Sequence, residues 1–288
     1  MGAVYKKELK VYFSNMTGYI VLSMMLIVAG FSCWLYNLYA QYATWQASLT
    51  MVCYTLLFVV PILTMRSLAE ERRTHTDQLL FSLPMSVGEM VLGKYFAMVT
   101  VFALPCGVMA LFPLILSMYG TVTLGAAYAS LFAFFLLGCA LIAIGMFMSS
   151  LTESQIIAAV LSFLAMLLCF LTTSLAGMLP ATALASYIEF TVVIALFCLL
   201  LYAMTKNCWI AIAAAFVLVG SLSAVYLSNR ELLTGAFSKV LKSLSVFDRL
   251  SGFLTSGLFD LTSILYFLSV AGLFVFFTVQ SVEKKRWS

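Results

Sequence analysis

The stretch AAYASLFAFFLLGCALIAIGMFMS, residues 126–149, contains no charged side chain. It is long enough for an α-helix to cross the roughly 30 Å hydrocarbon layer of a bilayer. Seven further apolar stretches of similar length lie along the chain, at residues 19–39, 51–68, 95–119, 156–179, 187–205, 209–227 and 262–279. The sequence therefore predicts an all-α fold, a polytopic transmembrane helical bundle of about eight spans.

Composition excludes an ordinary water-soluble domain. Of the 288 residues, 64% are hydrophobic and 9% are charged, against roughly 25% charged in a soluble domain. The first apolar stretch is longer than the core of a secretory signal peptide, so we expect it to be a permanent span. We expect one membrane domain over residues 1–288.

The eight-span count has one weak point. Only Lys206 and Asn207 separate the apolar stretches 187–205 and 209–227. A count of six spans, with a re-entrant hairpin around Lys206, is the alternative. In either case an even number of spans places both termini on one side of the membrane.

The distribution of Lys and Arg predicts which side that is. The chain has 15 Lys and Arg residues, and cytoplasmic loops are normally enriched in them. The larger group, with both termini, comprises Lys6, Lys7, Lys10, Arg66, Arg72, Arg73, Lys94, Lys206, Lys284, Lys285 and Arg286. The smaller group, on the other side, comprises Arg230, Lys239, Lys242 and Arg249. We therefore expect cytoplasmic termini.

Two amphipathic segments flank the spans. In residues 1–18, one helical face carries Tyr5, Leu9, Tyr12, Phe13 and Met16, and the other carries Lys6, Lys7, Lys10 and Ser14. This pattern predicts a helix in the inner membrane interface, where anionic lipid attracts the lysines.

The second amphipathic segment, 228–258, precedes the last span on the outer side. Ser228 and Glu231 have the spacing of a capping box, and apolar residues then repeat on one face as far as Phe247. We expect one amphipathic helix over residues 228–247.

The stretch GEMVLGK, residues 88–94, satisfies most of the phosphate-loop pattern. It is followed by Tyr95, where Ser or Thr should hold magnesium, and it leads into a membrane span. Ser86 and Glu89 instead have capping-box spacing for the third span. We therefore expect Lys94 to bind no nucleotide.

The residues offer little intramembrane chemistry. The single histidine, His75, lies in a charged loop, and the seven cysteines show no CxxC spacing. Ser150 and Glu153 have capping-box spacing after the fourth span. Glu189 is the one acid inside an apolar stretch, which makes it a candidate for the transport pathway. We predict no catalytic residue, cofactor site or metal site in the chain.

The most informative stretch, residues 66–94, joins the second and third spans. Charged residues come first, namely Glu70, Glu71, Arg72, Arg73 and Asp77, then the apolar cluster of Leu79, Leu80, Phe81 and Leu83, and then Pro84. A short helix with charges beside an exposed apolar patch suits docking to another protein. The alternative is that the leucines lie on the inner membrane surface.

The same stretch resembles the coupling region of ABC-2 permeases. That region has an acidic and basic cluster, a Gly-Thr-acid, a Leu-Leu pair, a Pro with a small residue, and Ile/Val-x-Gly-Lys before the third span. The matching positions here are Glu70 to Arg73, Asp77, Leu79 with Leu80, Pro84 to Ser86, and Val91 to Lys94. His75 stands where the family usually has glycine. Residues 6–22 also look like the start of this family, and 257–270 with 283–287 look like its gliding-motility branch.

The resemblance implies a permease in a prokaryotic cytoplasmic membrane that pairs with a second copy or a homologous permease. It also implies two cytoplasmic ATPase subunits, which would bind ATP and Mg²⁺, while the coupling residues Glu70 to Arg73, Asp77, Leu79, Leu80, Leu83 and Pro84 of this chain would contact them. Membrane lipid is an expected partner, and nucleic acid is not.

Three functions are compatible with the sequence. The leading hypothesis is an ATP-driven exporter of a peptide, lipid or amphipathic drug. A mechanical relay from a cytoplasmic ATPase to an extracytoplasmic partner is the second. A secondary carrier is the third, although most spans lack the ionisable relay that such carriers use.

Overall fold

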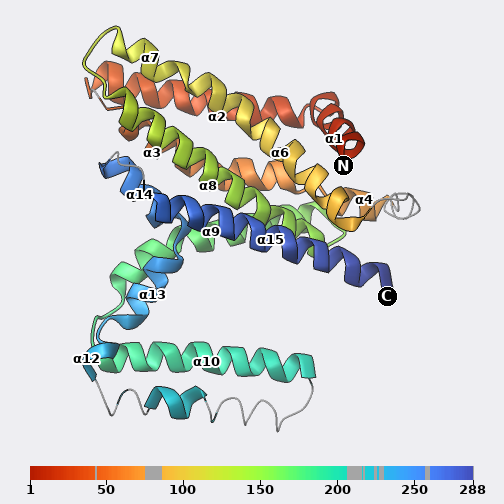
Figure 1. Ribbon diagram of the computed structural model, residues 1–288, viewed down its shortest axis with the longest axis vertical. Helices are drawn as coiled ribbons and strands as arrows, with labels where there is room; N and C mark the ends of the chain where they lie inside the picture. Colours follow the sequence, from red (N-terminus) through yellow and green to blue (C-terminus); the bar gives the residue numbers. More distant parts are fainter. Residues whose placement is uncertain are drawn as a thin grey trace. The chain divides into compact units, whose positions relative to one another are not determined.

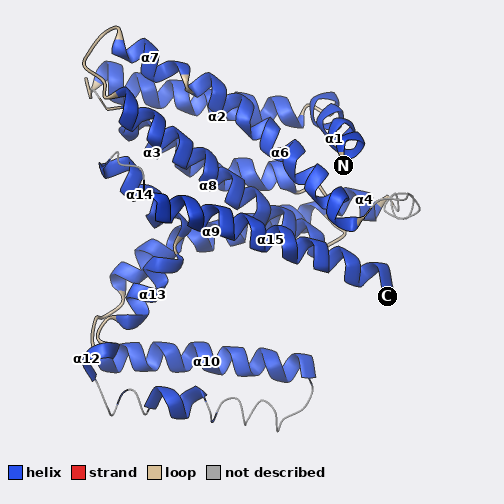
Figure 2. Cartoon of the chain, in the orientation of Figure 1, coloured by secondary structure: helices blue, strands red, loops and turns tan. Residues whose placement is uncertain are grey.

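The computed structural model describes residues 1–42, 44–74, 86–205, 216, 218–223, 226, 230–256 and 260–287. These residues form helices and connecting turns, and the ordered elements among them include no strand (Figures 1 and 2). The predicted all-α, polytopic helical bundle is confirmed.

The chain divides into two compact units, Met1–Leu168 with Arg249–Ser288, and Cys169–Asp248. The helices up to the fourth span are α1 (Gly2–Ser14), α2 (Thr17–Ser32), the π-helix η1 (Cys33–Tyr39), α3 (Trp45–Thr64), α4 (Ala69–Arg73), α6 (Val87–Met109), α7 (Leu111–Ser117) and α8 (Leu124–Leu151). The later helices are α9 (Gln155–Met178), α10 (Ala183–Thr205), α12 (Arg230–Leu233), α13 (Ala236–Leu244), α14 (Val246–Ser256) and α15 (Leu261–Trp287).

Six helical segments within the described residues are long and apolar enough to cross a membrane. They are Thr17–Tyr39, Trp45–Arg73, Val87–Ser117, Leu124–Leu151, Gln155–Met178 and Leu261–Lys284. Each overlaps a predicted span. The predicted span 187–205 lies within α10. Lys206, Asn207 and most of the predicted span 209–227 lie outside the described residues. The choice between six and eight spans stays a prediction.

Two spans, α3 and α6, begin more than one helical turn earlier than their apolar stretches. α3 begins at Trp45, because Gln46, Ser48 and Thr50 interrupt the apolar run without ending the helix. α6 begins at Val87, where the Ser86 hydroxyl accepts a hydrogen bond from the Glu89 amide at 3.2 Å. This bond confirms the predicted cap of the third span.

The core of the first unit is built around α8, which packs against α3, α6 and α15. Small residues let its neighbours approach closely, as is usual between membrane helices. A Cβ atom on Gly138 would collide with the ring of Phe102, and one on Gly145 would lie 2.6 Å from the Thr64 hydroxyl. The position of α8 therefore depends on its glycines.

The N-terminal helix α1 packs against α6 and α2. Its buried residues are Val4, Glu8 and Tyr12, while Lys6, Lys7 and Lys10 are exposed. The predicted apolar face is therefore only partly correct. Tyr12 is buried as expected, but Tyr5, Leu9 and Phe13 are half-buried, and Glu8 takes a place on the buried face. Met16 lies beyond the helix, 71% exposed and with φ of 60°.

The single helix expected over residues 228–247 is not formed. α12 and α13 are separated at Gly235, whose φ of 64° is incompatible with a continuous right-handed helix, and α13 ends at Leu244. The apolar face is only partly covered, since Leu233 is buried and Leu232 is 66% exposed. Ser228 lies outside the described residues.

The capping box expected at Ser150 and Glu153 is also wrong. α8 continues to Leu151, so Ser150 is still inside it. α9 begins at Gln155, after a turn in which the Ser154 amide donates to the Thr152 hydroxyl at 3.2 Å. The run Ser-Ser-Leu-Thr, residues 149–152, offers several hydroxyls that could accept from this turn. The spacing to Glu153 indicates Ser150, whereas the structure uses Thr152.

Candidate functional site

Lys94 is the most deeply buried cation in the described part of the chain, with 1% of its surface exposed. An unpaired ammonium at such a position would be costly. Its Nζ lies 2.7 Å from Glu71 Oε1, 2.9 Å from Glu8 Oε1 and 3.0 Å from the carbonyl oxygen of Ser67. An ammonium has three hydrogens, and each has an acceptor here.

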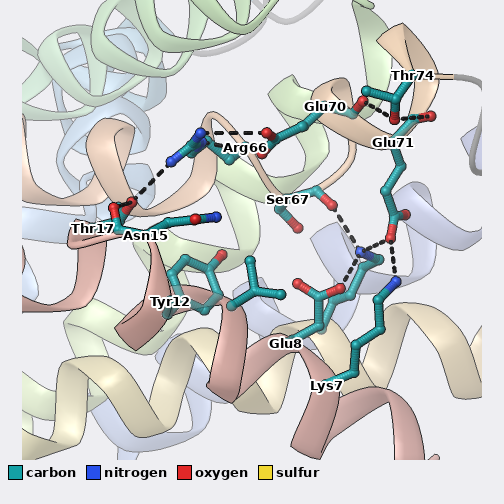
Figure 3. A pocket seen from close by; sticks show the side chains of 12 residues that line it. Lys7, Glu8, Tyr12, Asn15, Thr17, Arg66, Ser67, Glu70, Glu71 and Thr74 are labelled. Carbon is teal, nitrogen blue, oxygen red and sulfur yellow. Dashed lines mark hydrogen bonds and ion pairs between the residues drawn. The ribbon is translucent and has the colours of Figure 1, made fainter.

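The three acceptors come from different elements. Glu8 belongs to α1, Ser67 to the turn after α3, and Glu71 to α4; Figure 3 shows them converging. α1 approaches α6 closely because Gly93 has no side chain. A Cβ atom there would lie 3.2 Å from both the Met1 carbonyl and Val4. Lys94 therefore joins three separate segments of the first unit.

A second set of charges surrounds the buried triad. Lys7 lies 3.6 Å from Glu71 Oε1, and its side chain is 55% exposed. Arg66 Nε lies 3.1 Å from Glu70, and the Arg66 guanidinium also donates to the Thr17 hydroxyl at 3.3 Å. Three carboxylates thus face three cations. Exposed pairs of this kind contribute little, so Lys94 dominates the energetics of the cluster.

Tyr12 closes the buried side of the cluster. Its hydroxyl donates to the Leu63 carbonyl at 3.1 Å. Burial, with the Glu8 carboxylate adding to it, raises the pKa of the Tyr12 phenol well above its usual range. Tyr12 is therefore a neutral hydrogen-bond donor that fixes α1 to the end of α3.

α4 is also attached to the end of α8. The Ser149 hydroxyl accepts hydrogen bonds from the amides of Leu68 and Ala69, each at 3.3 Å. The Arg72 guanidinium donates to the Ser150 carbonyl. The Ser150 hydroxyl lies 3.1 Å from that of Ser281 on α15. Polar contacts therefore connect α4 to α1, α6 and α8, and through α8 to α15.

An open pocket of about 200 Å³ lies against this cluster. The six charged residues line it together with polar groups that include Asn15, Thr17 and Thr74 (Figure 3). Most of the lining residues are charged or polar, and the three carboxylates among them balance the three cations.

The predicted coupling residues fall into two groups. Glu70, Glu71, Arg72 and Arg73 form α4, where Arg73 is exposed and the other three are partly buried. The residues outside the described part of the chain are Asp77, Leu79, Leu80, Leu83 and Pro84, together with His75. The pathway candidate, Glu189, lies in α10 of the second unit.

Sequence reasoning missed the two central residues, Glu8 and Lys94. Glu8 does not belong to the predicted apolar face, which follows the aromatic residues of the N-terminal segment. A signal was present, since Val4, Glu8 and Tyr12 are spaced four apart and share a face. For Lys94, the family resemblance, the cytoplasmic charge count and the phosphate-loop pattern give no indication of its buried ion pairs.

The phosphate-loop pattern at residues 88–94 lies wholly within α6. Its backbone amides are committed to a helix, whereas a phosphate loop directs them at the ligand. The Lys94 ammonium is already surrounded by three acceptors. Both observations favour a structural role for Lys94 over a nucleotide-binding one.

Comparison with known proteins agrees with the architecture. The family model described as ABC-2 family transporter protein matches residues 35–227, about two thirds of the chain. A search of curated proteins found no match. The family match covers the candidate spans from the end of the first to α9, together with α4 and Lys94. The chain therefore belongs to the ABC-2 transporter family, as a multi-pass membrane permease that is not itself the ATPase.

Proposed function

We propose that this permease is the membrane-spanning part of an ATP-driven exporter in a prokaryotic cytoplasmic membrane. Two separate ATPase subunits would hydrolyse ATP with Mg²⁺, and a second permease would complete the pathway. The cargo would be a peptide, a lipid or an amphipathic drug. Family membership supports the ABC permease role, and the proposal adds the direction, the cargo class and the coupling route.

One observation carries the coupling route. The predicted coupling segment contains α4, which is held to α6 and α8 by buried or partly buried polar contacts and to α1 by the exposed Lys7. Packed helices linked in this way move as units, because cores and interfaces have discrete arrangements. Force applied to α4 by an ATPase would therefore reach two spans directly. A loop without such contacts would move on its own and would leave the spans in place.

Reconstitution tests the function. The permease and its ATPase would be placed in proteoliposomes, with the ATPase outside and one fluorescent probe from each cargo class. We expect ATP-dependent accumulation of at least one probe, and none when the ATPase carries an inactive Walker motif. Accumulation without ATP that follows an ion gradient would instead identify a secondary carrier. Permease-stimulated ATP hydrolysis without movement of any probe class would favour a mechanical relay.

A further inference from the structure

Glu189 lies in α10, an apolar helix of 23 residues. Its Oε2 atom is buried and has no hydrogen-bond partner within the described chain. Ser186, one turn earlier, is fully buried, and its hydroxyl also lacks a partner there. Residues three apart share a helical face. Two unsatisfied acceptors therefore lie one turn apart, although buried polar groups are nearly always hydrogen-bonded.

The basic residues described in this unit do not complete the site. Lys239 and Lys242 on α13 are exposed. Arg230 has its guanidinium 5.1 Å from the centre of the Tyr226 ring. Among the described residues, no ion pair joins any of these cations to Glu189. A carboxylate in an apolar helix, half-buried and with one oxygen shielded from solvent, marks a functional site whose partner should be sought.

Aromatic rings are concentrated around the same turn of α10. Tyr187 contacts the ring of Tyr226, and Phe190 contacts that of Phe237 edge to face, both with centroids 5.1 Å apart. Arg230 already occupies one ring face in this group. Aromatic faces attract cations and pack against apolar chains. A turn of α10 that carries both a carboxylate and such rings has the chemistry to bind an organic cation.

We propose that Glu189 and Ser186 bind the ammonium head of an amphipathic substrate, with the neighbouring rings contacting its apolar part. A primary ammonium would donate one hydrogen to the Glu189 carboxylate and another to the Ser186 hydroxyl. This would satisfy both unpartnered groups at once. That the bound amphiphile is cargo rests on the proposed transport function. The inference then narrows the cargo class to cationic amphiphiles.

Binding is testable without transport. Monodansylcadaverine, a fluorescent amphipathic primary amine, would be titrated into purified permease in the absence of ATPase and ATP. The matched probe is dansyl pentylamide, which has the same chain without the amine. Variants would be Glu189→Gln and Ser186→Ala, with Glu153→Gln as a control because Glu153 is an exposed acid outside the helices. Thermal unfolding would verify that each variant is folded.

We expect saturable binding of the amine to the unmodified chain. A charged hydrogen bond typically accounts for ten- to a hundredfold in affinity, so Glu189→Gln should weaken binding by about that factor. Ser186→Ala should weaken it by about threefold, and Glu153→Gln should leave it unchanged. The neutral probe should bind weakly and equally to all forms.

Two results would overturn the proposal. One is equal affinity of the amine for Glu189→Gln and for the unmodified chain. The other is a lack of saturable amine binding to the unmodified chain, which would mean that a proton or a second permease satisfies Glu189 instead. Competition by dodecylamine but not dodecanol, measured on the unmodified chain, keeps the test valid if a variant does not fold. Because no ATPase is present, failure here leaves the exporter function untouched.

Discussion

The Glu71 carboxylate lies 2.7 Å from the Lys94 ammonium and joins α4 to α6, two elements that residues 74–86 separate in the sequence. The ion pair is almost inaccessible to solvent, with the two side chains 13% and 1% exposed. At such burial, the loss of one partner leaves an unpaired charge. The contact is therefore a structural requirement as well as a mechanical link.

Replacing Lys94 should destabilise the protein strongly. Lys94→Met removes the cation and leaves Glu8 and Glu71 facing each other, which should cost about 3–5 kcal/mol. Lys7→Met removes an exposed cation from the same cluster and should cost about 0–1 kcal/mol. Chemical denaturation of both variants in one detergent would measure the difference. Equal free energies of unfolding for Lys94→Met and Lys7→Met would contradict the claim that the buried ion pair is worth more than the exposed one.

The close approach of α6 and α8 gives a second stability prediction. Gly138→Ala places a methyl group against the Phe102 ring and should destabilise by about 1–3 kcal/mol. Gly125 lies in the same helix with nothing within 4 Å of the added Cβ. Gly125→Ala should therefore be neutral or slightly stabilising. A melting temperature for Gly138→Ala at or above that of Gly125→Ala would be inconsistent with this packing.

Orientation is predicted from the charge distribution. A cysteine placed at Lys239 should react with an impermeant thiol reagent outside intact cells, and one placed at Thr76 only after permeabilisation. A background free of native cysteines is needed for both. The reverse pattern would place the termini outside. Labelling of a cysteine at Lys206 from outside would reject the eight-span topology.

The apolar cluster before Pro84 is predicted to contact the ATPase. Leu80 and Leu83 are three residues apart, so they would share a face if this stretch were helical, and burying both would contribute about 3 to 6 kcal/mol before ordering costs. Leu83→Asp would bury an unpaired charge, so ATPase recovery by affinity purification should fall sharply. Leu232→Asp is the control, since Leu232 is exposed on α12. Folded Leu83→Asp permease with full ATPase recovery and activity would reject the contact.

The sequence predicts the spans well, because twenty consecutive apolar residues have few alternatives to a membrane helix. It also predicts the cap at Ser86, since the hydroxyl and the amide that it accepts from are only three residues apart. These features depend on short-range chemistry. Start positions were less accurate, as at Trp45, where buried polar residues continue a helix that hydropathy alone would end.

The candidate site could be predicted only in part. The charges of α4 are evident in the sequence, but their partner Lys94 lies beyond the intervening segment and Glu8 lies near the N-terminus. Pairing of Glu8 with Lys94 joins residues 86 positions apart, and no local pattern encodes that. The broken helix at Gly235 was missed because apolar spacing continues across it. The positive φ of Gly235 is a property of the folded backbone, and the sequence does not reveal it.

The central claim is that α4 transmits ATPase motion to the spans through Lys94. The most direct measurement is the amount of cargo moved per ATP hydrolysed in proteoliposomes. It would compare the unmodified permease with the neutral triple variant Glu8→Gln, Glu71→Gln and Lys94→Met. The triple variant removes all three charges together, so it avoids the unpaired charge that destabilises Lys94→Met. We predict that it assembles with the ATPase and hydrolyses ATP, but moves several-fold less cargo per ATP. An unchanged ratio in a fully assembled triple variant would contradict the claim.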